Sequence, residues 1–162
     1  MRSQSKNSMI TLKNIDKDNY RECVNLSVAE EQVKFVVANA KSLAKAYVYY
    51  ETAHPLAVYA DGAMVGFVLY RDLQAEKNYV IDQMMTDKRY QGKGYGREAV
   101  RELFRQMRER GQFGRVCVCC CVANKAAIKF FRGFGFEQEG EEEAGEIVFG
   151  LDLVSYKCDP SK

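Results

Sequence analysis

Residues 89–96 of the 162-residue chain contain three glycines at alternate positions, Gly92, Gly94 and Gly96. Because glycine has no Cβ, a turn built from them lets main-chain N–H groups point toward one spot. The turn follows a β-rich run, residues 79–86, and precedes apolar residues at helical spacing, so we expect a strand, a turn and a helix. The start of a helix adds unpaired N–H groups and the positive end of its dipole. These features predict an anion site for a phosphate or pyrophosphate.

The spacing of these glycines excludes two common phosphate-binding motifs. A P-loop needs a Gly-Lys-Ser/Thr sequence, which is missing here. A dinucleotide fingerprint needs Gly-x-Gly-x-x-Gly in the first strand–helix unit. The stretch instead matches Gln-x-x-Gly-x-Gly, as Gln91, Gly94 and Gly96. Lys93 and Arg97 would add positive charge at the mouth of the site.

A second motif lies further along the chain and reads Asn124-x-x-Ala127, then Phe131, then Gly135-Phe136. Together with Gln-x-x-Gly-x-Gly and the order of elements, it resembles the GNAT superfamily of N-acetyltransferases over residues 10–154. The resemblance implies a single-domain α/β fold with a mixed, mostly antiparallel twisted sheet. Helices would cover both faces, and two central strands would splay apart to form an acyl-CoA cleft. It also implies acetyl-CoA as co-substrate and no metal.

The same resemblance assigns roles to residues on the cofactor side of the cleft. The backbone at Met84, Met85 and Thr86 would pair with the pantetheine arm, the glycine loop would bind the pyrophosphate, and Asn124 would hold the cofactor arm. The cofactor-binding residues implied are Met84, Met85, Thr86, Gln91, Gly92, Lys93, Gly94, Tyr95, Gly96, Arg97, Asn124 and Phe131.

Two further positions concern proton transfer. A substrate ammonium must lose a proton before its nitrogen can attack, and Asp82 stands where polyamine-type members of the family carry an acidic residue for this step. The alternative is that Asp82 is a charge on a solvent-facing strand position. The family tyrosine that protonates the departing thiolate is replaced by Phe131, and the neighbouring Phe130 restores no hydroxyl. We expect activity to survive, because a CoA thiolate is a fair leaving group near neutral pH.

The acceptor is predicted from a narrower resemblance, to bacterial spermine/spermidine (diamine) N-acetyltransferases. A polyamine favours spaced carboxylates, and Glu30, Glu31 and Asp82 could supply them; Glu30 and Glu31 could equally serve a helix dipole. Two other functions stay open: acetylation of another amine (an aminoglycoside, an amino acid or a protein N-terminus) and CoA sensing without turnover. The resembling segments are residues 28–32, 35–39, 42–46, 65–70 and 81–84.

Composition sets broad limits on the fold and on partners. A chain of 162 residues with 47% apolar and 28% charged residues fits one globular domain. We expect that domain at residues 9–156, between tails at 1–8 and 157–162. The net charge of +2 gives no indication of nucleic-acid binding, and the sequence has neither an 18-residue apolar run nor a signal peptide. We therefore expect a cytoplasmic protein without a membrane partner, with a homodimer as the candidate assembly.

The cysteines at positions 117, 119, 120 and 121 crowd into one apolar run. In an extended strand alternate side chains point to opposite faces, so four such thiolates could not surround one metal. We expect small buried hydrophobes in a reducing compartment, with a redox or metal role as the alternative.

The remaining elements follow from periodicity and turn residues. Asp16 is expected to cap a helix that ends near residue 26. A long helix is expected over residues 28–46, with its buried stripe at Val33, Val36, Val37, Ala40 and Ala44. Asp61-Gly62 predicts a hairpin turn. Strands are expected at 9–13, 56–60, 64–70, 78–86, 115–122, 136–137 and 146–154, and further helices at 95–110 and 125–132.

Overall fold

The computed structural model describes residues 8–158 of the chain. Seven strands and four α-helices lie within this range, together with one turn of 3₁₀ helix at Glu30–Gln32. The strands are β1 (Ile10–Asn14), β2 (Ala53–Ala60), β3 (Ala63–Leu73), β4 (Asn78–Thr86), β5 (Arg115–Cys121), β6 (Glu137–Glu143) and β7 (Glu146–Asp152). The helices are α1 (Tyr20–Asn25), α2 (Asn39–Val48), α3 (Tyr95–Arg110) and α4 (Lys125–Arg132).

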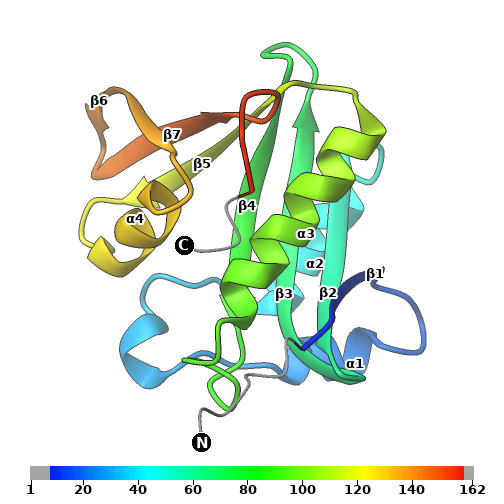
Figure 1. Ribbon diagram of the computed structural model, residues 1–162. Coiled ribbons are helices and arrows are strands. Elements are labelled where there is room, and N and C mark those ends of the chain that lie inside the picture. The colour runs from blue at the N-terminus through cyan, green and yellow to red at the C-terminus, as the bar shows by residue number, and fades with distance from the viewer. Residues whose placement is uncertain (1–7, 159–162) are drawn as a thin grey trace, which may run out of the picture.

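All the described strands form one twisted sheet in the order β1-β2-β3-β4-β5-β7-β6 (Figure 1). Among these strands, β4 and β5 run parallel and every other neighbouring pair is antiparallel. The parallel pair is joined through α3, because a chain that leaves one end of a strand must cross the sheet before it can start a parallel neighbour. The predicted mixed, mostly antiparallel sheet is confirmed.

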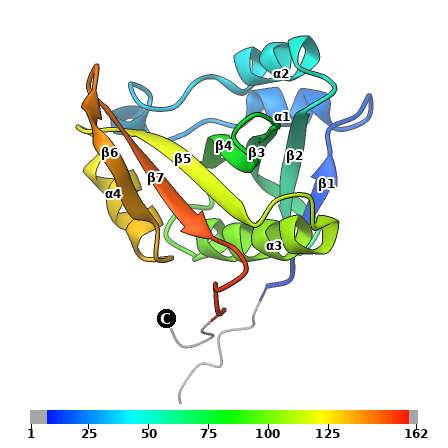
Figure 2. The same ribbon diagram turned by 90° about the horizontal axis from the view of Figure 1, so that it is seen from above.

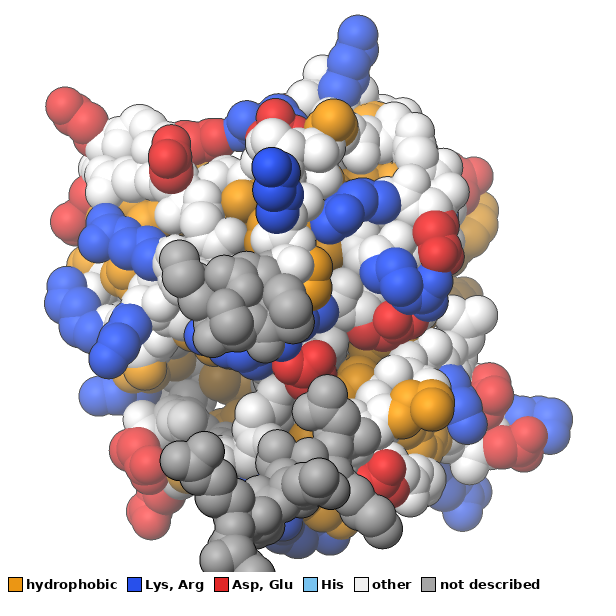
Figure 3. All heavy atoms as spheres, viewed as in Figure 1, with side chains coloured by type: hydrophobic (Ala, Val, Ile, Leu, Met, Phe, Trp, Pro, Cys, Tyr) orange, Lys and Arg blue, Asp and Glu red, His pale blue; other side chains and the backbone are white. Residues whose placement is uncertain are grey.

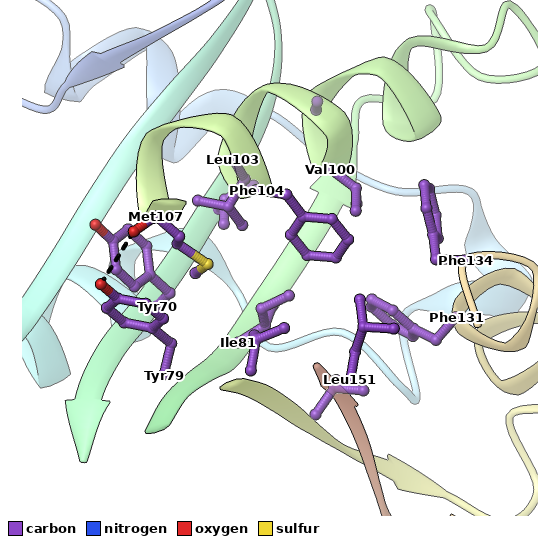
Figure 4. Packing of buried hydrophobic residues seen from close by; sticks show 14 of the residues in the cluster. Tyr70, Tyr79, Ile81, Val100, Leu103, Phe104, Met107, Phe131, Phe134 and Leu151 are labelled. Carbon is purple, nitrogen blue, oxygen red and sulfur yellow. Dashed lines mark hydrogen bonds between the residues drawn. The ribbon is translucent and has the colours of Figure 1, made fainter. Parts of the chain in front are cut away.

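Helices cover both faces of the sheet, as predicted: α1 and α2 lie on one face, and α3 and α4 lie on the other (Figure 2). On the second face, α3 buries a stripe of apolar residues against β4 and its neighbours (Figure 4). The hydroxyl of Tyr79 on β4 donates a hydrogen bond to the carbonyl of Met107 on α3, at 3.2 Å. The stripe comprises Ala99, Val100, Leu103, Phe104 and Met107.

The first face has a separate and smaller hydrophobic core. Cys23 of α1 and Ala46 of α2 pack there with Phe67 and Met85 from β3 and β4. Cys23 is fully buried, and desolvation raises the pKa of its thiol to about 11. This cysteine therefore acts as a small hydrophobic residue, as the sequence predicts.

The backbone confirms the predicted hairpin turn and the predicted helices at residues 95–110 and 125–132. Asp61 and Gly62 form the turn between β2 and β3, both with positive φ angles (50° and 86°), as a tight hairpin requires. The α3 helix stops at Gly111, whose φ of 61° is typical of a glycine cap. The side chain of Asn124 accepts a hydrogen bond from the N–H of Ala127, at 3.2 Å, and so caps α4.

The long helix predicted over residues 28–46 is wrong. The chain instead makes the short 3₁₀ turn, a run of turns, and then α2 from Asn39. The predicted stripe is not buried either: Val33 and Val37 are 60% and 46% exposed. The inward face of α2 is polar, with Asn39 and Ser42 buried beside Ala46, because Gln83 of β4 supplies hydrogen-bond partners beneath it.

Two other boundaries need correction. The first helix begins at Tyr20 rather than after Asp16, because the carboxylate of Asp16 accepts hydrogen bonds from the N–H groups of Asp18 and Asn19 in a turn that precedes it. The strand predicted at residues 136–137 is longer than expected, since β6 occupies Glu137–Glu143.

The predicted tails lie mostly outside the described range, which leaves out residues 1–7 and 159–162. None of the helices within residues 8–158 is long and apolar enough to cross a membrane.

Candidate functional site

The central strands β4 and β5 separate partway along their length. Within the described chain they pair at three positions, the last of which joins Ile81 to Val118. Beyond this pair β5 continues against β7, while β4 stays paired with β3 as far as Thr86. The separation leaves one backbone edge of β4, from residue 82 to residue 86, without a strand beside it in the part of the chain that is described.

A β-bulge lies at the same point. Leu69 of β3 pairs with Gln83, whereas the next residue, Tyr70, pairs with Ile81, so that Asp82 is the extra residue. A bulge re-aims side chains locally. Here both Asp82 and Gln83 reach residues of α2, namely Lys45 and Ser42.

A cavity of about 840 Å³ opens where the strands separate. It is bordered by the end of β4, the glycine loop, the start of α3, the start of α4 and part of the chain between α1 and α2. Figure 3 shows this side of the molecule, where Lys and Arg side chains gather over α4. The α4 helix itself carries Lys125, Lys129 and Arg132.

Most of the predicted cofactor-binding residues line this cavity. Lys93 is the exception among them: its side chain is exposed and its ammonium group lies 5.6 Å from the centre of the Tyr90 ring. Those on the cavity wall are Met84, Met85, Thr86, Gln91, Gly92, Gly94, Tyr95, Gly96, Arg97, Asn124 and Phe131.

The glycine loop has the backbone that the sequence predicts. Gly92 and Gly94 have φ angles of 76° and 82°, in the left-handed region that favours glycine. Gly94 is also the N-cap of α3, and the N–H of Glu98 is bonded to its carbonyl at 3.1 Å. The N–H groups of the first turn therefore have no partner inside the helix. The starts of α3 and α4 border the same cavity, which suits an anion.

These features fit acetyl-CoA. An extended pantetheine arm contains amides, and the open edge of β4 at residues 82–86 offers N–H and C=O groups that need partners when buried. A pyrophosphate needs N–H donors and positive charge, which the α3 start and Arg97 supply at one end of the cavity. The guanidinium of Arg97 lies 5.4 Å from the centre of the Phe134 ring, a distance typical of a cation–π contact.

The predicted acceptor residues differ in whether they line the cavity. Glu31 lines the cavity, whereas Glu30 is exposed and is not among the described lining residues. Asp82 also lies outside that lining, although it is the first β4 residue after the strands separate. The structure thus brings Glu31 to the cavity and leaves Glu30 and Asp82 outside its lining.

Asp82 is held by two cations. Both Nε and Nη2 of Arg71 donate hydrogen bonds to its carboxylate, the latter at 3.2 Å, and Nζ of Lys45 lies 3.2 Å from Oδ1. The hydrogen bond to Asp82 raises the pKa of Arg71 above its usual value, so the guanidinium is firmly charged. Lys45 is the more exposed cation, at 42% against 19% for Arg71.

Part of the cavity wall was not predicted from the sequence. We call residues 28–38 the wall segment; Val28, Gln32, Phe35 and Val36 from it line the cavity beside Glu31. Lys125 and Phe130 line it from α4. The sequence does not predict the wall segment, because its exposed valines have the spacing of a buried helical stripe.

The cysteine run on β5 has no metal-binding arrangement. Cys117 and Cys120 are buried as predicted, whereas the prediction is wrong for Cys119, which is exposed because alternate side chains of β5 point to opposite faces of the sheet. All six cysteines lie within the described residues as free thiols. Among residues 8–158 no cluster of His, Cys, Asp or Glu is arranged to hold a metal ion. Burial raises the pKa of the Cys117 and Cys120 thiols to about 11, and partial desolvation together with a hydrogen bond to Glu146 raises that of Cys119 to about 11, so all three are protonated at neutral pH.

Comparison with known proteins agrees with this geometry. The chain is 29% identical over 153 residues to the spermine/spermidine N(1)-acetyltransferase of Bacillus subtilis. The aligned region covers 89% of this chain and 99% of that protein. The spermidine N-acetyltransferase of Vibrio cholerae, solved with CoA and spermine, superposes with a TM-score of 0.72 at 14% identity, over 91% of this chain and 97% of that one. An aminoglycoside acetyltransferase solved with coenzyme A superposes with a TM-score of 0.73 at 15% identity, over 89% and 95%.

The two superpositions show a shared fold at low identity. The sequence model of the acetyltransferase (GNAT) family matches residues 12–136, which include β4, the glycine loop and α4. The chain therefore belongs to the acetyltransferase (GNAT) family, as an N-acetyltransferase that uses acetyl-CoA as its co-substrate.

Proposed function

We propose that this enzyme transfers the acetyl group to a primary amine of a polyamine or diamine, such as spermine or spermidine. The observation that carries the proposal is the position of Asp82, a carboxylate placed by a bulge at the point where β4 and β5 separate. An ammonium group near the reactive end of the cleft would find a negative partner there. The similarity to a spermine/spermidine acetyltransferase over nearly its whole length supports the same acceptor.

A polyamine also needs a second negative group at a distance from the first. Glu31 provides one on the cavity wall, on the 3₁₀ turn at Glu30–Gln32. Glu30 is the neighbouring exposed carboxylate and could meet a third ammonium group outside the cavity. Spaced carboxylates of this kind distinguish a polyamine from an amine with a single charge.

On the cofactor side, residues of the chain are proposed to bind and orient acetyl-CoA. We propose that the N–H groups at residues 92–97 hold the pyrophosphate, assisted by Lys93 and Arg97. The open backbone at Met84, Met85 and Thr86 would hold the pantetheine arm, with Asn124 beside it. Bound acetyl-CoA supplies an acetyl group activated as a thioester. Phe131 is buried against the core and lines the cavity, where its ring would keep water from that end.

On the acceptor side Asp82 is the proposed general base. Its carboxylate would take the proton of the substrate ammonium, directly or through water, and so free the nitrogen lone pair for attack on the thioester carbonyl. A substrate ammonium that approaches Asp82 competes with Lys45, which is the half-exposed one of its two partners. Arg71 would stay in place, because it contacts the carboxylate through two nitrogen atoms.

The transfer is proposed to be direct, in a complex that contains both substrates. A covalent route would need a nucleophile, and the thiols on β5 are the obvious candidates. The raised pKa values of Cys117, Cys119 and Cys120 make these three thiols poor nucleophiles at neutral pH, and no cysteine of β5 is among the residues that line the cavity. The new C–N bond would therefore form as the C–S bond breaks, with the thiolate leaving without help from a tyrosine at position 131.

A second acceptor class is favoured by one observation. Lys45 and Arg71 place two positive charges beside the single carboxylate of Asp82. This excess of positive charge also suits an acceptor that carries its own carboxylate, such as an amino acid or an acidic peptide with a free amine. This amine would be acetylated by the same chemistry.

The test is the release of free CoA thiol from acetyl-CoA with a panel of acceptors. The panel contains spermine, spermidine, putrescine, an aminoglycoside, lysine and an acidic peptide with a free N-terminus. We expect the highest kcat/KM with spermine or spermidine. Preferential turnover of lysine or of the acidic peptide would replace the polyamine proposal with the second acceptor class.

A further inference from the structure

The α2 helix is polar on the side that faces the sheet and apolar on the side that faces solvent. Asn39 and Ser42 are 4% and 5% exposed beneath the helix. Ala40, Ala44 and Val48 lie on the opposite side, are all exposed, and form one stripe because each is one helical turn from the next. Figure 2 shows α2 on the outer side of its layer, with no other element of the described chain above it. A surface helix normally buries its apolar stripe, so the stripe of α2 lacks the usual cover within residues 8–158.

Large apolar side chains extend this stripe. Tyr47 and Val48 are 81% and 69% exposed, and Tyr50, just after the helix, is 74% exposed. Tyr47 and Tyr50 also border a groove of about 560 Å³ between α1, α2 and β2. Contiguous exposed apolar side chains beside a groove are typical of a surface that binds another protein. We call Ala40, Ala44, Tyr47, Val48 and Tyr50 the α2 face.

The α2 face has a small half and a large half. Ala40 and Ala44 carry only a methyl group, so the backbone of another helix can approach them closely. Tyr47 and Val48, at the other end of the helix, carry large side chains. In an antiparallel pair of α2 helices related by a two-fold axis near Ala44, the large half of each helix packs on the small half of the other. The α2 face is therefore complementary to itself.

The charges around the α2 face favour the same arrangement. Lys41 lies in the first turn of α2, and Glu51 follows the C-terminal end of the helix; both are exposed. In an antiparallel pair, Lys41 of one copy faces the C-terminal end of the other helix, where the dipole is negative and Glu51 adds its charge. A parallel pair would place lysine beside lysine. The antiparallel pair thus joins opposite charges.

The apolar area available is in the range that a dimer needs. A standard interface buries about 800 Å² on each partner. Two tyrosine side chains can bury about 300–500 Å² between them, and Val48 and the two alanines of the α2 face add to this. Tyr20, across the groove, and Val37, just before the helix, are 42% and 46% exposed and extend the apolar surface further.

The edge strand β6 is a poorer surface for a second copy. It lies at one edge of the sheet, and all its residues are exposed. Its sequence is dominated by glutamates, so two copies joined through this edge would bring carboxylates together, and like charges oppose strand pairing. These glutamates are Glu137, Glu139, Glu141, Glu142 and Glu143. The α2 face has no carboxylate among its residues.

We propose that the α2 face binds a second copy of this chain, with the two α2 helices antiparallel about a two-fold axis near Ala44. Removal of the exposed tyrosine and valine side chains from water drives the association. The second copy covers α2 from outside, while Ser42 and Lys45 hold the helix to Gln83 and Asp82 from inside. The dimer does not depend on which amine is acetylated, so its test is independent of the proposed function.

The test is the mass of the full chain in solution, measured by analytical ultracentrifugation over a wide range of concentrations. We expect a mass that rises from 18.5 kDa toward twice this value. Ala44→Arg places two like charges at the axis and blocks close approach, so we expect it to raise the dimer Kd at least about 100-fold. Ala75→Arg is the matched control, because Ala75 is also exposed but lies in the turn between β3 and β4. The control should keep the wild-type dimer Kd.

Exchange of the charges tests the orientation of the two helices. Lys41→Glu should raise the dimer Kd about threefold to tenfold, since exposed ion pairs contribute little and the dimer loses two of them. Addition of Glu51→Lys should restore most of the affinity. A double variant as weak as Lys41→Glu alone would contradict the antiparallel arrangement. A wild type that stays at 18.5 kDa at every concentration would overturn the proposal, and so would a dimer that Ala44→Arg leaves intact.

Discussion

The two sides of the cavity are built by different means. The proposed cofactor side consists mainly of backbone: the open edge of β4, two left-handed glycines and the starts of α3 and α4. The proposed acceptor side depends on side chains that meet over long distances in sequence, such as Gln32 with Gln91 on the cavity wall, or Asp82 with Arg71 and Lys45 outside the cavity lining. Substitutions should therefore act differently on the two sides: through backbone conformation on the first, and through charge and hydrogen bonds on the second.

This difference also explains why the same fold serves different amines. A backbone site for a CoA thioester depends on glycine positions and strand separation, which change little when side chains change. An acceptor site made from side chains on connecting segments can be altered one residue at a time. The aminoglycoside acetyltransferase that superposes on this chain has the same fold at 15% identity.

The largest expected effect is on the acceptor side, at Asp82. We expect Asp82→Asn to lower kcat with spermidine by at least about 100-fold, since this is the range of general acid–base catalysis, and to leave the acetyl-CoA Kd unchanged. Asp72→Asn is the matched control. Asp72 is also a strand aspartate paired with an arginine, Arg110 at 3.0 Å, but it packs near the C-terminal end of α3, away from the cavity.

The control should lose stability and keep its activity. Asp72 is 6% exposed and is also bonded to His54, at 2.9 Å, so its replacement is expected to lower Tm. The kcat of each folded molecule should stay at the wild-type level. If both variants lost kcat to the same extent, Asp82 would be a structural partner of Arg71 and not the base.

An intermediate effect is expected on the cofactor side, at Gly94. Alanine there must adopt a φ near 82°, which costs about 1–2 kcal/mol, and a Cβ would meet no atom within 4 Å. We expect Gly94→Ala to raise the acetyl-CoA Kd about fivefold to thirtyfold, because the loop can relax away from the binding conformation. Equilibrium titration with acetyl-CoA measures this.

Gly62→Ala provides the control for strain alone. Gly62 has a φ of 86° in the β2–β3 turn and also has open space around it. Its replacement should cost stability without any change in the acetyl-CoA Kd. An equal loss of affinity in both variants would mean that the loop acts through global stability and not as a binding site.

The smallest effect on activity is expected at Cys119, the exposed thiol of β5. Partial desolvation and the neighbouring Glu146 raise its pKa to about 11, so the reactive thiolate is rare at pH 7 and becomes more abundant as the pH rises. The rate of alkylation by iodoacetamide should increase about tenfold per pH unit between pH 7 and 10. Cys119→Ala should keep the wild-type kcat. An acetylated Cys119 found by mass spectrometry after rapid quench would contradict direct transfer.

Most of the fold could be predicted from the sequence because its signals are local. Alternation, the Asp61-Gly62 turn and the helical spacing before Gly111 each act within a few residues. The wall segment could not be predicted in this way. Its valines at helical spacing resemble a buried stripe, and only the side chain of Gln83, more than 40 residues away, shows why the inward face of α2 is polar.

The site residues differ in the same way: local sequence patterns predict some of them, and others depend on contacts between distant segments. The glycine loop could be located because positive φ angles require glycine at defined spacing, and Asn124 because a helix cap is a local feature. The pairing of Asp82 with Lys45 depends on how α2 lies against β4. No pattern within either segment specifies that contact.

The most direct test of the account is a set of initial rates with acetyl-CoA and spermidine both varied. The account predicts thiol release that depends on spermidine, and lines that intersect in a double-reciprocal plot, as expected for direct transfer in a ternary complex. Parallel lines would indicate an acetylated enzyme and would contradict direct attack. Release that does not respond to spermidine, from a protein that binds acetyl-CoA, would contradict the polyamine acceptor itself.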